Sequence, residues 1–236
     1  MEKIVEVKNL VKNYGQGDVL VRALRNVDLE IQAGDFTAMA GPSGSGKSTL
    51  LNIIGGLDKP TQGQVLVEGQ SLNELSRTKL SQLRRDRIGF IFQSYNLIPV
   101  LTALENAEYI LMLQGVPRNQ RRERVMELLE DVGLGGLDNR FPRELSGGQQ
   151  QRVAIARAVA SEPALILADE PTANVDSKTA ADLLDLMARL NEEKNTTFFF
   201  STHDREVMKR ARHLLLLQDG KIAYNGAPVH GLAEEK

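Results

Sequence analysis

The sequence contains no cysteine and no tryptophan. Without cysteine the chain can form neither a disulfide bond nor a thiolate metal site, which suits a reducing compartment. The sequence also lacks an excess of charge of either sign, since 29 lysines and arginines stand against 31 aspartates and glutamates. No overall positive field is therefore available to attract nucleic acid, and we expect no nucleic-acid partner.

Long hydrophobic runs are missing as well. The longest apolar stretches, residues 164–168, 198–200 and 214–217, fall far short of the roughly 18 apolar residues that a membrane span needs. No signal-peptide pattern is visible at the N-terminus. We therefore expect any association with a membrane to come through a partner protein. The composition, 42% hydrophobic and 25% charged over 236 residues, is that of a globular chain with one core and room for a small subdomain.

The apolar pattern of the remaining sequence predicts an α/β fold. Continuous apolar runs at 36–40, 164–168 and 196–201 are typical of strands that are covered on both faces. Between residues 102 and 133 the apolar residues recur at helical spacing, which indicates a helical insert from about 94 to 160. We expect further strands at 4–10, 23–31, 63–68 and 88–92, and helices at 48–57, 149–160 and 177–194.

A glycine-rich turn lies between the strand at 36–40 and the helix at 48–57. Residues 41–48, GPSGSGKS, follow the phosphate-binding pattern G-x-x-x-x-G-K-[ST]. The glycines let successive N–H groups point inward at phosphate, and the helix adds the positive end of its dipole. Lys47 supplies a positive charge for the phosphates, and the Ser48 hydroxyl is placed to bind Mg²⁺. The predicted nucleotide-binding residues are Gly41, Pro42, Ser43, Gly44, Ser45, Gly46, Lys47, Ser48 and Thr49.

Two acids end the apolar strand at 164–168. In a phosphate-binding protein, Asp169 at the carboxyl end of the strand would hold Mg²⁺ through water, and Glu170 would polarise an attacking water. The alternative is a strand that simply leaves the core through two solvated acids. The glycine-rich turn earlier in the chain favours the catalytic interpretation.

A second turn with the features of an anion site precedes the helix at 149–160. Residues 145–149, LSGGQ, place a serine and two glycines before a helix N-terminus, where free N–H groups can bind an anion. This motif resembles the signature of the ABC-transporter ATPases. The resemblance implies that Ser146, Gly147, Gly148 and Gln149 contact the ATP held by the opposite subunit of a head-to-tail homodimer.

The resemblance covers residues 4–225 and assigns roles to further residues. It implies that Gln93 contacts Mg²⁺ and the attacking water, that His203 lies at the γ-phosphate, and that residues 174–176 form the D-loop. Tyr14 resembles the aromatic that stacks on adenine, although it could also be a core or surface aromatic. The implied cofactors are ATP and Mg²⁺. The expected catalytic residues are Glu170, His203 and Gln93, and the expected Mg²⁺ ligands are Ser48, Gln93 and Asp169.

The family fold implied by these motifs is that of a P-loop NTPase with a RecA-like core. We expect one ABC ATPase domain over residues 1–236. In it, 1–93 and 161–236 form the core with an antiparallel β subdomain, and 94–160 form the helical signature subdomain. The chain departs from the family pattern at Ala173, where relatives commonly have glycine, and Ala173 lacks glycine's access to positive φ.

One branch of the family is indicated by residues 92–99, FQSYNLIP, and 101–106, LTALEN. They resemble the branch that contains the lipoprotein-releasing ATPase LolD, the macrolide-exporter ATPase MacB and the division protein FtsE. This resemblance implies that the chain lies in the cytoplasm, on the inner face of the cell membrane, and drives integral-membrane permease subunits. Tyr95, Leu97 and Leu101 are candidate permease contacts, with plain packing of the insert as the alternative.

Three functions follow from the resemblance. The first is ATP hydrolysis that drives export or the extraction of lipoprotein, drug or peptide, as in the LolD and MacB systems. The second is a regulatory ATPase that moves a membrane partner without transporting cargo, as for FtsE. The third, a soluble ABC protein of translation or DNA repair, fits poorly because the sequence has neither a second ATPase domain nor a long coiled coil.

Overall fold

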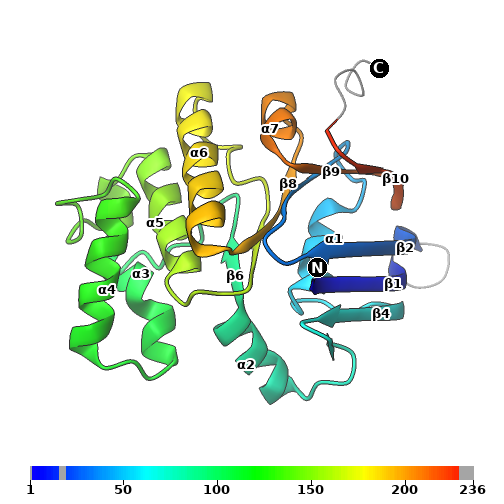
Figure 1. Ribbon diagram of the computed structural model, residues 1–236, viewed down its shortest axis with the longest axis horizontal. Coiled ribbons are helices and arrows are strands. Elements are labelled where there is room, and N and C mark those ends of the chain that lie inside the picture. The colour runs from blue at the N-terminus through cyan, green and yellow to red at the C-terminus, as the bar shows by residue number, and fades with distance from the viewer. Residues whose placement is uncertain (1, 16–19, 229–236) are drawn as a thin grey trace. The chain divides into compact units, whose positions relative to one another are not determined.

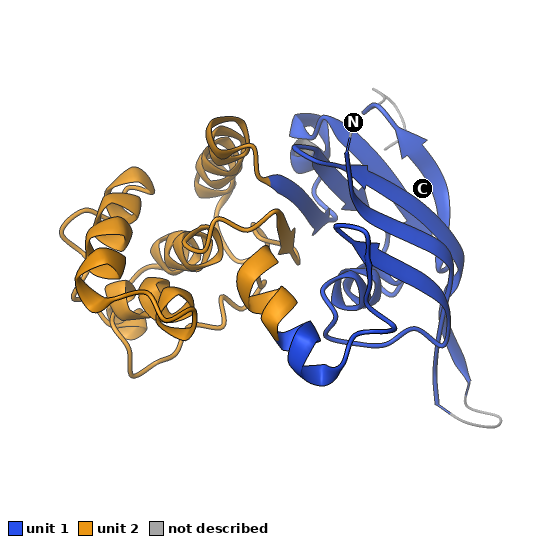
Figure 2. Ribbon diagram, turned by 60° about the horizontal axis from the view of Figure 1, so that its bottom comes forward, with its two compact units in different colours: residues 1–81, 197–236 blue, residues 82–196 orange. Residues whose placement is uncertain are grey.

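The computed structural model describes residues 2–15 and 20–228. The chain divides into two compact units, which Figure 2 colours separately. Unit 1 comprises Met1–Ser81 and Thr197–Lys236, and unit 2 comprises Gln82–Thr196. Within the described residues, no helix has both the length and the apolar character needed to cross a membrane. The predicted α/β class is confirmed.

Unit 1 contains the predicted antiparallel sheet. Its four strands are β1 (Lys3–Tyr14), β2 (Val21–Gln32), β4 (Gln62–Val67) and β5 (Gln70–Ser71), in the order β2-β1-β4-β5 (Figure 1). Strand β1 pairs with β2 and β4, and its apolar residues Val5, Val7 and Leu10 are buried. Both long strands extend beyond the apolar stretches from which they were predicted. Backbone pairing continues into polar residues that carry no hydrophobic signal.

The second sheet of unit 1 has an aromatic core. Strand β3 (Phe36–Ala40) lies parallel to β8 (Thr197–Thr202) and β9 (His213–Gln218), and β10 (Lys221–Gly226) runs antiparallel to β9. The ring of Phe36 packs against those of Phe198 and Phe200, with centroid distances of 5.7 and 4.9 Å. The bulky phenylalanines of β8 therefore fill the core beside β3. The helices of this unit are α1 (Lys47–Ile54) and the short α7 (Arg205–Arg210).

Unit 2 combines two parallel strands with a group of helices. Strand β6 (Ile88–Ile91) pairs with β7 (Leu165–Ala168). Helix α3 (Ala103–Leu113) packs against α4 (Arg118–Asp131) and α5 (Gly147–Val159), as Figure 1 shows. The unit also holds α6 (Ser177–Lys194) and a 3₁₀ turn, Pro142–Glu144. It is wider than the predicted helical segment 94–160 because α5 also packs on β6 and α6.

Helix α2 (Arg77–Arg87) was not predicted. Its only buried residue is Leu83, so the segment has no periodic apolar face that a sequence pattern could reveal. The basic residues Arg84, Arg85 and Arg87 lie in its last turn, where the negative end of the helix dipole stabilises positive charge. Arg85 also pairs with Asp86 at 2.7 Å. The boundary between the two units falls within this helix.

A fully buried asparagine organises the loop before α3. The Asn106 Oδ1 accepts a hydrogen bond from the Ile98 N–H at 2.7 Å. Its Nδ2 donates to the carbonyls of Ile98, Leu101 and Thr102 at 3.0–3.1 Å. A single side chain thus supplies a partner for the Ile98 N–H and the Leu101 carbonyl and a further donor for the carbonyls of Ile98 and Thr102.

Replacing Asn106 by leucine should destabilise the fold strongly, because the Ile98 N–H and the Leu101 carbonyl would lose the hydrogen bonds of the buried amide. We expect the free energy of unfolding to fall by roughly 3 kcal/mol. Thr102→Ala, which removes only the N-cap of α3, should cost about 1 kcal/mol. Urea denaturation of the two variants measures the difference. If Asn106→Leu loses no more stability than Thr102→Ala, the hydrogen bonds of Asn106 do not stabilise the loop.

Candidate functional site

The glycine-rich turn runs from the end of β3 to the start of α1. Its first glycine, Gly41, has φ of 156°, and an added Cβ would lie 2.1 Å from the Leu217 carbonyl oxygen. Gly46 caps α1 in a left-handed conformation (φ 106°), and a Cβ there would lie 2.6 Å from the Ala23 carbonyl oxygen. Both positions require glycine because backbone of unit 1 approaches them closely.

The donors of this turn suit a polyphosphate. Among the described residues, the N–H groups of Gly46, Lys47, Ser48 and Thr49 donate to no backbone carbonyl. The buried Lys47 ammonium donates to the carbonyls of Gly41 and Pro42 at 2.8 and 3.0 Å, directly over the turn. Within the described part of the chain, the buried Ser45 hydroxyl has no hydrogen-bond partner. Free N–H groups at a helix N-terminus beside a positive charge form a phosphate site.

Tyr14 ends strand β1, and its side chain is oriented from both sides. Its hydroxyl donates to the Asp58 carboxylate at 2.7 Å, and the Lys12 Nζ lies 4.6 Å from its ring centroid. Burial raises the pKa of Tyr14, and the hydrogen bond to Asp58 raises it further. The ring remains 41% exposed, so it can stack on a planar ligand. Adenine stacking by Tyr14 stays a prediction.

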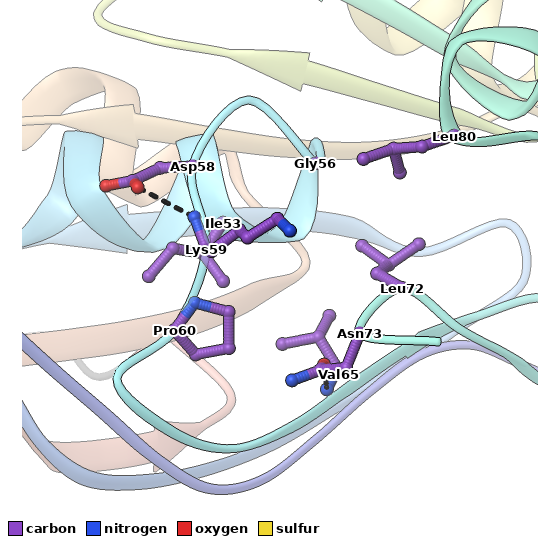
Figure 3. A pocket seen from close by; sticks show the side chains of 9 residues that line it. All are labelled: Ile53, Gly56, Asp58, Lys59, Pro60, Val65, Leu72, Asn73 and Leu80. Atoms are coloured by element: carbon purple, nitrogen blue, oxygen red, sulfur yellow. Dashed lines mark hydrogen bonds between the residues drawn. The ribbon is translucent and has the colours of Figure 1, made fainter. Parts of the chain in front are cut away.

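Asp58, which holds Tyr14, lies in the loop after α1. Burial opposes its ionisation, but hydrogen bonds from Lys12 and Tyr14 outweigh burial and lower its pKa. The carboxylate also accepts the Lys59 N–H at 2.7 Å, beside a small cavity of about 80 Å³ that Figure 3 shows. Three donors therefore fix this carboxylate, and the orientation of Tyr14 depends on it.

The two predicted acids follow β7 in unit 2. Strand β7 is buried throughout, and the Asp169 N–H donates to the Ile91 carbonyl at 2.9 Å, which extends the pairing with β6. Glu170 has φ of 44°, a left-handed conformation that is uncommon for residues other than glycine. Its carbonyl accepts the Ala173 N–H at 3.2 Å. The chain thus turns sharply at Glu170, and such strained positions cluster at functional sites.

The LSGGQ turn forms a capped helix N-terminus. The Ser146 hydroxyl accepts the Gln149 N–H at 3.3 Å, and the Gln149 side chain accepts the Ser146 N–H at 2.9 Å. This capping box leaves the N–H groups of Gly147 and Gly148 without a backbone carbonyl among the described residues. A Cβ on Gly148 would lie 2.5 Å from the Thr179 methyl group. The turn therefore presents two free donors on a narrow surface, as an anion site requires.

Gln93 is exposed after β6, and its backbone is tied to the D-loop. Its carbonyl accepts the Asn174 Nδ2 at 2.8 Å, and the Tyr95 hydroxyl donates to the Asn174 carbonyl at 3.3 Å. A Cβ on Gly147 would lie 2.9 Å from the same hydroxyl. Unit 2 thus brings Gln93, Asn174 and the LSGGQ turn together. Tyr95, one candidate permease contact, is engaged within unit 2.

Arg157 supports this cluster, and the sequence did not single it out. Tyr95 and Asn96 are consecutive left-handed residues, with φ of 62° and 48°, at a cost of about 1–2 kcal/mol each. The Arg157 guanidinium donates to both of their carbonyls, at 2.8 and 2.6 Å. Burial lowers the pKa of Arg157. No sequence signal points to this role because Arg157 lies 61 residues from Asn96.

His203 lies in unit 1, directly after β8. The imidazole is exposed, and the following turn is shaped by the Asp204 N–H, which donates to the Thr202 hydroxyl at 3.0 Å. Strand β8 lies parallel to β3, whose carboxyl end leads into the glycine-rich turn. His203 therefore leaves the sheet at the same edge as that turn, which is compatible with the predicted role at the γ-phosphate.

The close approach at Gly41 predicts different effects for two alanine substitutions. Gly41→Ala should displace the turn, cost roughly 2–3 kcal/mol of stability and weaken ATP binding strongly. Gly44→Ala meets no atom within 4 Å, so it should cost only roughly 1 kcal/mol through its positive φ of 78°. Urea denaturation and titration with a fluorescent ATP analogue distinguish the variants. Equal losses in the two would show that the contact with Leu217 is unimportant.

Comparison with known proteins shows which family this chain resembles. The protein-family profile described as ABC transporter matches residues 24–173. An uncharacterized ABC transporter ATP-binding protein of Thermotoga maritima is 49% identical, over 94% of this chain and 94% of that protein. The lipoprotein-releasing ATP-binding protein LolD 1 of Rhodopseudomonas palustris is 45% identical, over 94% of this chain and 100% of its own.

A solved structure and a longer relative agree with this similarity. The macrolide export ATP-binding/permease protein MacB of Hyphomonas neptunium is 44% identical over 98% of this chain but only 36% of that protein. The dimeric structure of the ATP-binding cassette MJ0796, bound to ADP and Pi after hydrolysis, has a TM-score of 0.87 at 46% identity. The structural match covers 96% of this chain and 99% of the MJ0796 chain. The chain belongs to the ABC transporter family.

Proposed function

We propose that this chain is the ATP-hydrolysing subunit of an ABC transport complex and acts as a head-to-tail homodimer on membrane permease subunits. One observation carries the proposal: the chain has two separate helix N-termini that are built for anions, at α1 and at α5. The N-terminus of α1 binds the phosphates of one ATP, so the N-terminus of α5 is available to the ATP bound by another copy. The dimeric state of the MJ0796 structure supports a homodimer.

The nucleotide would be held by residues of the glycine-rich turn and by Tyr14. Lys47 exchanges its carbonyl partners for phosphate oxygens, and the N–H groups of α1 bind the same phosphates. Tyr14, oriented by Asp58, stacks on the adenine. Ser48, Gln93 and Asp169 are the residues that would hold Mg²⁺, which neutralises charge that develops on the phosphates.

Hydrolysis requires a water that is oriented and polarised. Glu170 accepts a proton from this water, and its strained backbone fixes where the carboxylate leaves strand β7. Gln93 orients the same water, and His203 donates a hydrogen bond to the γ-phosphate. In the second copy, the free N–H groups of Gly147 and Gly148 bind that γ-phosphate, while Ser146 and Gln149 hold their helix terminus in shape.

Permease binding is supported by an apolar stripe on α3. Tyr109, Met112 and Leu113 are exposed at positions i, i+3 and i+4, so they share one face of the helix. Val100, in the loop that precedes this helix, is 77% exposed. Leu97 and Leu101, in the same loop as Val100, are half-buried. Exposed apolar groups concentrated in this way mark protein interaction sites, and we assign this stripe to a helix of the permease.

The similarity to LolD and MacB favours export or the extraction of lipoprotein, drug or peptide from a membrane. The chain would then lie on the cytoplasmic face of the inner membrane. The alternative is a regulatory ATPase that transmits motion without cargo. Purification from detergent-solubilised native membranes with ATP and vanadate tests the assignment. A co-purified permease with a large extracytoplasmic domain supports it, and recovery of soluble partners alone contradicts it.

The role of Glu170 predicts the behaviour of an isosteric variant. Glu170→Gln cannot accept a proton but keeps the shape of the side chain, so it should bind ATP and dimerise. Its turnover should fall at least about 100-fold. Size-exclusion chromatography with ATP and a phosphate-release assay measure the two properties. Turnover equal to that of the unmodified protein would remove Glu170 from the mechanism.

The apolar stripe predicts a separate effect on assembly. Met112→Asp combined with Leu113→Asp should reduce co-purification with the permease at least about tenfold, because two charges would be buried in an apolar contact. The basal ATPase activity of the isolated chain should not change. Met126→Asp, at an exposed apolar residue of α4, is the matched control. If both changes reduce recovery equally, the stripe is not the permease contact.

A further inference from the structure

We propose that Asn174 and Arg157 are positioning residues that fix the backbone of Gln93 for its role at Mg²⁺ and the attacking water. The inference rests on the role proposed above for Gln93. It concerns the residues 93–96, called here the Gln93 segment, and the two side chains that hold it. All of these residues lie in unit 2.

The Gln93 segment is anchored at both ends by side chains from distant parts of the sequence. At its start, the Gln93 carbonyl accepts the Asn174 Nδ2 at 2.8 Å. At its end, the carbonyls of Tyr95 and Asn96 accept both nitrogens of the Arg157 fork, at 2.8 and 2.6 Å. Three short hydrogen bonds therefore hold a segment of four residues that belongs to no helix or strand.

The side chain of Gln93, unlike its backbone, is not held by hydrogen bonds among the described residues. It is also exposed. A fixed backbone with a side chain available to a ligand is the arrangement that a preorganised site needs.

Arg157 is suited to this task in a way that lysine is not. Arg157 is half-buried and, among the described residues, its guanidinium pairs with no carboxylate. Its planar fork reaches two adjacent carbonyls at once, whereas an ammonium is a single point of charge. These carbonyls are brought side by side by the two left-handed residues Tyr95 and Asn96. The conformation that follows Gln93 thus depends on the fork.

The D-loop anchor also touches the LSGGQ turn. The Tyr95 hydroxyl donates to the Asn174 carbonyl at 3.3 Å, and Gly147 leaves room for that hydroxyl because it has no Cβ. The Asn174 carbonyl therefore accepts one hydrogen bond from the Gln93 segment, and the Asn174 side chain donates one to it. Removing its side chain breaks only the bond to the Gln93 carbonyl, so Asn174→Ala is a narrow test.

The experiment is a double-mutant cycle between Asn174 and Gln93, measured as steady-state ATP hydrolysis by the full chain. Asn174 is exposed, so Asn174→Ala should keep the thermal unfolding midpoint of the unmodified protein. We expect kcat to fall about fivefold with little change in the KM for ATP, because one orienting hydrogen bond is lost. The Mg²⁺ concentration needed for half-maximal activity should rise.

The cycle separates positioning from a general structural role. Asn174 acts through Gln93 in this proposal, so Asn174→Ala should lower kcat no further once Gln93→Ala is present. The matched control is Asn139→Ala, at an exposed asparagine of the same unit whose amide, among the residues that the structure describes, bonds only Asp138. The control should leave kcat unchanged. Arg157→Lys should show the same loss and the same coupling to Gln93→Ala.

Each contrary outcome has its own meaning. If Gln93→Ala alone leaves turnover unchanged, the role proposed for Gln93 is wrong, and the inference fails with it. If Gln93→Ala lowers turnover but Asn174→Ala does not, only the inference is overturned. Losses that multiply in the double variant, or an Asn174→Ala loss matched by Asn139→Ala, also overturn it.

Discussion

The first peptide N–H groups of an α-helix have no carbonyl partner within the helix, and this protein uses that constraint twice. At α1 the donors follow a glycine-rich turn and lie beside the Lys47 ammonium. At α5 they belong to Gly147 and Gly148, behind a capping box made by Ser146 and Gln149.

Close backbone approach is what makes the helix ends usable. Gly41 and Gly46 lie against carbonyl oxygens of unit 1, and Gly148 lies against the Thr179 methyl group in unit 2. A side chain at Gly41 or Gly46 would collide with these backbone oxygens, and one at Gly148 would have to displace the Thr179 methyl group. The glycines are therefore required both by the ligand surface that they leave open and by the packing behind them.

Three left-handed residues lie in the loops of unit 2 that carry predicted site residues. Glu170, Tyr95 and Asn96 are all left-handed, and the last two are held by the Arg157 fork. Such conformations persist only where surrounding groups enforce them. In the Gln93 segment the enforcing groups are visible: one asparagine, one arginine and one tyrosine hydroxyl.

The sequence by itself determined the α/β class, the glycine-rich turn, the two acids after β7 and the LSGGQ turn, because each is a local pattern along the chain. It did not reveal α2, which buries only Leu83, or strand β10, which has no buried run. Only the tertiary structure decided that Asp58 orients Tyr14 and that Arg157 and Asn174 hold the Gln93 segment. These contacts join residues 44 to 81 positions apart, and hydrogen bonds of about 3 Å between such residues depend on the packed fold, which no local pattern encodes.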